Sequence, residues 1–212
     1  MKHILEYIHR PNKTEVGVGT NTNDSYLKLS SVIEESEMFL KNEEEKFLHI
    51  QSGEEVVFKA IKYKTGSKEY RLTKLGAVRT HFDIECGDEL VFRREISDKY
   101  IQPIFEIKKF KKTMFYPSSK GRYILVYPER LPNWEENGET DLLVWYKGMK
   151  FLLEISFIER TKARADSPDF TDYYSVSLHG KELNKQSYCL SYRKGELHFD
   201  EYEKWTFNEI MY

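Results

Sequence analysis

The sequence is poor in the residues that build metal centres and disulfide frameworks. Its 212 residues include two cysteines, Cys86 and Cys189. Neither belongs to a CxxC pair, and no histidine lies at metal-ligand spacing from them. We therefore expect no zinc site, no disulfide framework and no cofactor.

Long apolar runs are also missing. No stretch approaches the roughly 18 consecutive apolar residues of a transmembrane helix, so we expect no membrane partner. The first residues, Met1 to Glu6, lack the extended apolar segment of a secretory signal peptide. The cytoplasm is the expected compartment.

A strong net charge is the third absence. The 33 basic and 35 acidic residues give a formal net charge of −2, which excludes general polyanion binding by the whole chain. Any nucleic-acid surface must therefore come from local segregation of charge. With 40% hydrophobic and 15% aromatic residues, the chain can bury a substantial core.

Alternation of apolar and polar residues dominates the pattern and predicts a mainly β fold. In the first half it marks strands at 4–9, 25–29, 55–63, 89–93 and 101–110. The capping-box pattern Ser31 to Glu34 predicts one early helix whose Ile33, Met38 and Phe39 share a face, although a polar loop is the alternative.

A basic cluster at 108–112, followed by Pro117 to Gly121, predicts a domain boundary between 1–112 and 113–212. The second part is again rich in strand patterns, at 122–127, 141–146, 151–157, 173–178 and 187–192. Gly148, Gly180 and Gly195 stand where hairpin turns are expected. We expect a β-rich extension or a second small domain.

Two segments in the first part have the composition of a DNA-contacting surface. Residues 17–25 contain small turn formers with Asn and Thr side chains, which can contact phosphates and base edges. Residues 59–74 contain six basic side chains and a single acid, Glu69, and their centre at 64–71 has the pattern of a hairpin tip. A two-stranded ribbon fits the major groove, but an ordinary polar loop and a solvated basic strand face remain the alternatives.

The order and spacing of these segments resemble a known family. Residues 58–63, the polar tip and residues 69–76, with the Gly-Asp turn and strand at 86–92, are similar to the N-terminal effector-binding domain of EcoRII-like type II restriction endonucleases. The resemblance covers about residues 12–110. It implies a DNA-binding pseudobarrel of about seven strands with one or two short helices, which grips the major groove of double-stranded DNA between two arms.

The resemblance also implies which residues make contact. Glu69 and Arg71 fall where the family reads bases, whereas Asn23 replaces a histidine of the family and the C-arm tip is shorter. By this resemblance, the chain would be the effector part of a restriction system. Its partner would be a nuclease domain or subunit, and the DNA site that it binds would be CCWGG-like. The implied DNA-binding residues are Thr20, Asn21, Thr22, Asn23, Asp24 and Ser25 in the N-arm, and Lys62, Lys64, Ser67, Lys68, Glu69, Tyr70, Arg71 and Lys74 in or beside the C-arm.

The second part carries a competing signal. Asp141 opens an apolar strand, a turn follows, and Glu154 lies on the next strand, as in the metal-binding core of many nucleases. Ser156 stands where the nuclease core has a lysine, and no helical pattern follows it. We therefore expect no catalysis by this chain, with a complete Mg²⁺-dependent nuclease as the alternative. A protein-binding β module is the third hypothesis.

Overall fold

The computed structural model describes residues 2–12, 15–16, 26–62, 69–85, 88–109, 113–117, 122–126, 139–158 and 173–212. Contacts between residues divide the chain into two units. Unit 1 comprises 1–110 and 204–212, and unit 2 comprises 111–203. The sequence analysis did not anticipate that residues 204–212 return to unit 1.

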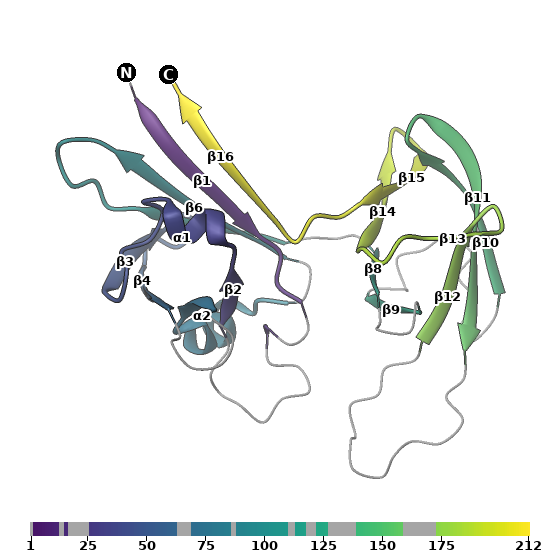
Figure 1. The fold of residues 1–212 in the computed structure, drawn as a ribbon, viewed down its shortest axis with the longest axis horizontal. Helices are drawn as coiled ribbons and strands as arrows, with labels where there is room; N and C mark the ends of the chain where they lie inside the picture. Colours follow the sequence, from purple (N-terminus) through teal and green to yellow (C-terminus); the bar gives the residue numbers. More distant parts are fainter. Residues whose placement is uncertain are drawn as a thin grey trace, which may run out of the picture. The chain divides into compact units, whose positions relative to one another are not determined.

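Unit 1 is built from one curled sheet of eight described strands in the order β16-β1-β6-β7-β3-β4-β5-β2 (Figure 1). The strands are β1 (His3–His9), β2 (Leu27–Leu29), β3 (Glu44–His49), β4 (Glu55–Lys62), β5 (Tyr70–Thr73), β6 (Glu89–Ile96), β7 (Ile104–Lys108) and β16 (Trp205–Met211). Only the β3–β7 neighbours are parallel among these strands. The predicted mainly β, pseudobarrel-like fold is confirmed.

The core of unit 1 is aromatic. Strand alternation directs Tyr7, Phe47, Phe58, Phe92 and Phe105 inward, and all five are at most 1% exposed. Most neighbouring rings of this set meet edge to face or tilted, for example Phe47 and Phe58 with centroids 5.5 Å apart, whereas Tyr7 and Phe92 are stacked. Such pairs add to the stability gained from burial alone.

Two short helices accompany the sheet in the described part of unit 1, α1 (Ser31–Glu35) and α2 (Leu75–Phe82). The predicted helix exists, but its N-cap is Ser30, whose hydroxyl accepts a hydrogen bond from the Ile33 amide. It ends at Glu35, so the buried Met38 lies beyond it. Helix α2 was not predicted, because its eight residues have only two buried positions, Leu75 and Val78.

Unit 2 is a sheet that closes on itself. Its strands run in the order β11-β10-β15-β14-β8-β9-β12-β13, and β11 also pairs with β12. Their bounds are β8 (Thr113–Pro117), β9 (Tyr123–Val126), β10 (Glu139–Tyr146), β11 (Met149–Ile158), β12 (Tyr173–Leu178), β13 (Lys181–Glu182), β14 (Tyr188–Arg193) and β15 (Glu196–Glu201). One buried cluster, including Phe115, Leu153, Tyr188 and Phe199, fills the interior.

The glycines predicted to form hairpin turns do so. Gly148, Gly180 and Gly195 each follow a residue that also has positive φ, namely Lys147, His179 and Lys194. Two consecutive left-handed residues define the turn that best matches the twist of paired strands. Within the described residues, no helix is both long and apolar enough to cross a membrane.

Candidate nucleic-acid interface

The pairing of β2 with β5 brings the two predicted arms to one edge of the unit 1 sheet. Strand β2 follows residues 20–25 after Tyr26, and β5 begins directly after Glu69. The strands are antiparallel, and Lys28 lies opposite Arg71. Both segments therefore join adjacent strands, and β2 is the last of the described strands in this sheet.

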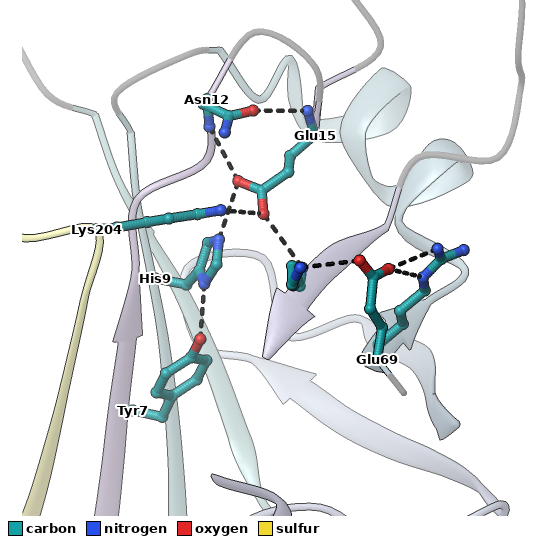
Figure 2. A network of polar contacts seen from close by, with 8 residues as sticks. Tyr7, His9, Asn12, Glu15, Glu69 and Lys204 are labelled. Carbon is teal, nitrogen blue, oxygen red and sulfur yellow. Dashed lines mark hydrogen bonds and ion pairs between the residues drawn. The ribbon is translucent and has the colours of Figure 1, made fainter. Parts of the chain in front are cut away.

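Four side chains form a connected group on the outer face of this strand pair, which we call the arm-base cluster: Tyr26, Lys28, Glu69 and Arg71. The Lys28 ammonium donates to Glu69 Oε1 at 2.8 Å. The Arg71 guanidinium donates from Nε and Nη2 to Glu69 Oε2 at 2.9 and 2.6 Å, as Figure 2 shows around Glu69. The guanidinium carbon lies 4.0 Å from the centroid of the Tyr26 ring.

Two further predicted cations are also held in ion pairs. Lys62 at the end of β4 pairs with Glu34, and Lys74 pairs with Glu44 at 2.5 Å. The lysine side chains are 51% and 43% exposed, so the pairs are open to water. Exposed ion pairs are weak, about 0–1 kcal/mol, and a phosphate can compete for these cations.

Tyr70 is a predicted contact whose side chain is buried in the structure. It is 3% exposed, because alternation along β5 points Tyr70 and Leu72 inward and Arg71 outward. Burial, together with the charge of Glu34, raises the pKa of Tyr70 to about 12. The free protein therefore does not present this side chain at its surface, and a contact between Tyr70 and DNA stays a prediction.

A buried polar network anchors the segment that leads into the N-arm (Figure 2). The carboxylate of Glu15, a residue 6% exposed, accepts hydrogen bonds from the amides of Asn12 and Lys28, each at 3.1 Å. It also receives His9 Nε2 at 3.2 Å and the Lys204 ammonium at 2.8 Å. Four parts of unit 1 thus meet at one carboxylate.

The protonation states in this network follow from burial. Burial by itself would raise the pKa of Glu15, but the hydrogen bond from His9 and the charge of Lys204 hold it at about 2. Burial lowers the pKa of His9 and raises that of Tyr7 well above its usual value. Tyr7 therefore keeps its proton and donates to His9 Nδ1 at 2.6 Å. His9 carries its single proton on Nε2 and donates it to Glu15.

The sequence analysis missed this network. The spacing of His9, Asn12 and Glu15, three residues apart, was a local signal for a polar turn after a strand. Lys204 is remote in sequence, and only the pairing of β16 with β1 brings it here. Asn12 Oδ1 accepts from the Glu15 amide at 3.0 Å, which closes the turn.

The proposed nuclease carboxylates are neighbours in unit 2, since Asp141 lies directly opposite Glu154 on β10 and β11. However, Glu154 Oε2 accepts hydrogen bonds from the Ser177 hydroxyl at 2.5 Å and the Gly180 amide at 2.9 Å. This carboxylate thus braces the β12–β13 turn. Across the described ranges, no three His, Cys, Asp or Glu side chains form a group that could hold a metal ion.

A cavity of about 610 Å³ lies in unit 1, lined by residues 35–37, 39–41, 94–97 and 99–101. Arg94 forms part of its wall and is held by the Met38 carbonyl at 3.0 Å and by Glu45. The lining includes acidic, basic and apolar side chains, and it contains none of the predicted DNA contacts.

Nine of the predicted contacts lie outside the described residues: Thr20, Asn21, Thr22, Asn23, Asp24, Ser25, Lys64, Ser67 and Lys68. No protein-family model, curated protein or solved structure matches this chain.

Proposed function

We propose that this protein binds double-stranded DNA through unit 1, using residues 20–25 and 62–71 as two arms. The pairing of β2 with β5 carries the proposal, because it joins both segments to one sheet edge. The partner would be a duplex site in the cytoplasm, within a restriction system that also supplies the nuclease.

The chemistry of the arm-base cluster supports this proposal. Lys28 and Arg71 are exposed by 56% and 23%, and both face Glu69 on the outer surface. A lysine is suited to phosphate, and an arginine fork to the guanine edge. Glu69 holds both cations in the free protein and can accept from a cytosine amino group once DNA replaces it as their partner.

The first test is the salt dependence of binding to a random duplex and to a duplex selected from a library. Neutralisation of about five to seven phosphates gives a slope of log K against log salt of about −4 to −6. A slope near zero, or no binding at about 100 mM salt, contradicts the proposal and favours a protein-binding module.

The second test uses Glu69→Gln, which removes the charge and keeps the shape. Binding to random duplexes should rise, because Lys28 and Arg71 lose their competing carboxylate. Binding to the selected site should fall, because the neutral amide keeps one acceptor oxygen but loses the negative charge that strengthens the hydrogen bond from a cytosine amino group. Opposite changes in the two affinities cannot come from partial unfolding.

The matched control is Glu55→Gln, which frees Lys46 from a comparable exposed ion pair of 2.6 Å on β3 and β4. Neither affinity should change by more than about fivefold, since an exposed pair is worth at most about 1 kcal/mol and Glu55 and Lys46 lie on β4 and β3 rather than on β2 or β5. If Glu55→Gln and Glu69→Gln act alike, binding responds only to net charge, and the arm-base cluster is not the contact surface.

Arg71→Ala provides the test of base reading. We expect about a 5- to 150-fold loss of discrimination between the selected and random duplexes, since a bidentate arginine–guanine pair is worth about 1–3 kcal/mol. Lys28→Ala should weaken both duplexes about equally, because a phosphate contact carries no sequence information. Equal effects of the two variants would contradict the proposed division of roles.

A further inference from the structure

Strand β16 is the outermost described strand of the unit 1 sheet, and Figure 1 shows it beside β1. The two strands pair along their whole length, from His3–Met211 to His9–Trp205. Hydrogen bonds continue past the strand ends, since Lys2 and Tyr212 exchange amide-to-carbonyl bonds of 3.1 and 2.9 Å. Strand β16 is therefore firmly held on one side.

The register fixes which backbone groups of β16 face away from β1. Lys2 and Tyr212 are a hydrogen-bonded pair, and such pairs alternate along antiparallel strands. The even-numbered residues of β16 therefore bond to β1. The amides and carbonyls of the odd-numbered residues point outward, where no described segment pairs with them: Trp205, Phe207, Glu209 and Met211.

This outer edge lacks the usual protection against pairing with another strand. Residues 205–211 contain no proline, lysine or arginine, and Glu209 is their only charge. Met211 and Tyr212 are 65% and 73% exposed. By contrast, β2 at the other edge of this sheet has three residues and the lysine Lys28.

We propose that β16 pairs with β16 of a second copy of this chain, antiparallel about a two-fold axis through Asn208. This dimer does not depend on the proposed DNA binding. In this register Trp205 meets the second copy's Met211, and Phe207 meets the second copy's Glu209. Every outward-facing amide and carbonyl then finds a partner, as in strand addition at a sheet edge.

Charge and length select this register over its neighbours. Only registers that match odd-numbered with odd-numbered residues satisfy the outward groups. An axis through Glu209 would place two carboxylates opposite each other, which is destabilising. An axis through Phe207 would leave Met211 beyond the second strand. With the axis through Asn208, the uncharged side-chain amide of this residue lies opposite Asn208 of the second copy.

The register is tested by disulfide formation in the full chain with Asn208→Cys. Two residues on the axis form a non-hydrogen-bonded pair with Cα atoms about 4.5 Å apart, within the range of about 4.4–6.8 Å that a disulfide spans. The matched control is Thr206→Cys, on the same face of β16, whose copies would lie about 13 Å apart. We expect the Asn208→Cys protein to cross-link at least tenfold faster under mild oxidation.

Equal cross-linking of the two variants, or none by Asn208→Cys, overturns the proposal. A second measurement follows the dimer without oxidation, by sedimentation over a concentration series. Glu209→Pro removes an outward amide and no bond to β1, so the fold is kept while self-association weakens about tenfold or more. Glu209→Ala should change it less than about threefold. A wild type that stays monomeric, or equal self-association of the two Glu209 variants, also overturns it.

Discussion

The two units bury different kinds of polar side chain. Among the described residues, all buried aspartate, glutamate, histidine and arginine side chains belong to unit 1: His9, Glu15, Glu45, His49, Asp88 and Arg94. The buried polar residues of unit 2 are hydroxyl-bearing, namely Thr113, Thr140 and Ser191. Unit 2 closes its sheet around an apolar cluster, whereas the sheet of unit 1 has two free edges among its described strands.

This difference shows how each unit holds its loops. A closed sheet satisfies its backbone groups by strand pairing and needs few charged anchors. In unit 1, Glu15 fixes the segment that leads into the N-arm through its bonds to two amides, His9 and Lys204. Buried charged anchors are sensitive to loss of one partner.

The largest effect is expected for Arg94→Met in unit 1. It leaves Glu45, 5% exposed, as an unpaired buried carboxylate, and should cost about 3–5 kcal/mol of unfolding free energy. Hydrogen exchange of the β6 amides reports on unit 1 alone. In unit 2, Arg193→Met breaks an exposed pair with Asp200 and should cost no more than about 1 kcal/mol. Similar losses of unfolding free energy in both units would contradict the difference between the buried ion pair of unit 1 and the exposed pair of unit 2.

Glu15→Gln should have the next largest effect, roughly 3 kcal/mol at neutral pH. The folded pKa of about 2 lies below the ordinary value of 4.5, and each unit corresponds to about 1.4 kcal/mol. Because the folded pKa is lowered, this stability is present above about pH 4.5 and is lost as the pH falls towards 2.

The titration of His9 also lowers stability as the pH falls, but at a higher pH than the titration of Glu15. Its folded pKa is lowered from 6.5 by burial, so the unfolded chain binds a proton more readily below that pH and stability falls. Denaturation of the wild type at several pH values should show both losses, and Glu15→Gln should remove the more acidic one. An unchanged acid profile in the variant would show that Glu15 is not the titrating anchor.

The sequence predicted the strands and turns of this fold better than the side-chain hydrogen bonds and ion pairs that anchor its segments. Alternation located β4 and β6, and glycine marked the hairpins at 148, 180 and 195, because both signals are local. The arms were placed beside one another only through the resemblance. Ion pairs between Lys28 and Glu69, or Lys204 and Glu15, depend on strand register and could not be read from spacing. The burial of Tyr70 was not foreseen, because its neighbours Glu69 and Arg71 suggested an exposed segment.

Glu154→Gln in unit 2 should have a smaller effect on stability than Glu15→Gln. The hydrogen bond from the Ser177 hydroxyl lowers the pKa of Glu154, but the carboxylate lies at the surface, where water can replace it. Neither this variant nor Asp141→Ala should change DNA binding. Mg²⁺-dependent cleavage of plasmid DNA by the wild type, lost in either variant, would establish the nuclease alternative.

The smallest effects are expected where the two units are alike, at buried hydroxyls with no hydrogen-bond partner in the described structure: Tyr70 in unit 1 and Ser191 in unit 2. A buried hydroxyl without a partner loses its water and gains nothing in return. Tyr70→Phe and Ser191→Ala should therefore leave stability within about 0.5 kcal/mol or raise it by up to about 1 kcal/mol.

Tyr70→Phe should also leave both DNA affinities unchanged, since the Tyr70 side chain is buried. A loss above about 1 kcal/mol in one unit alone would reveal a polar partner there, and a loss of DNA binding in Tyr70→Phe would show that the hydroxyl becomes exposed when the arms engage the duplex.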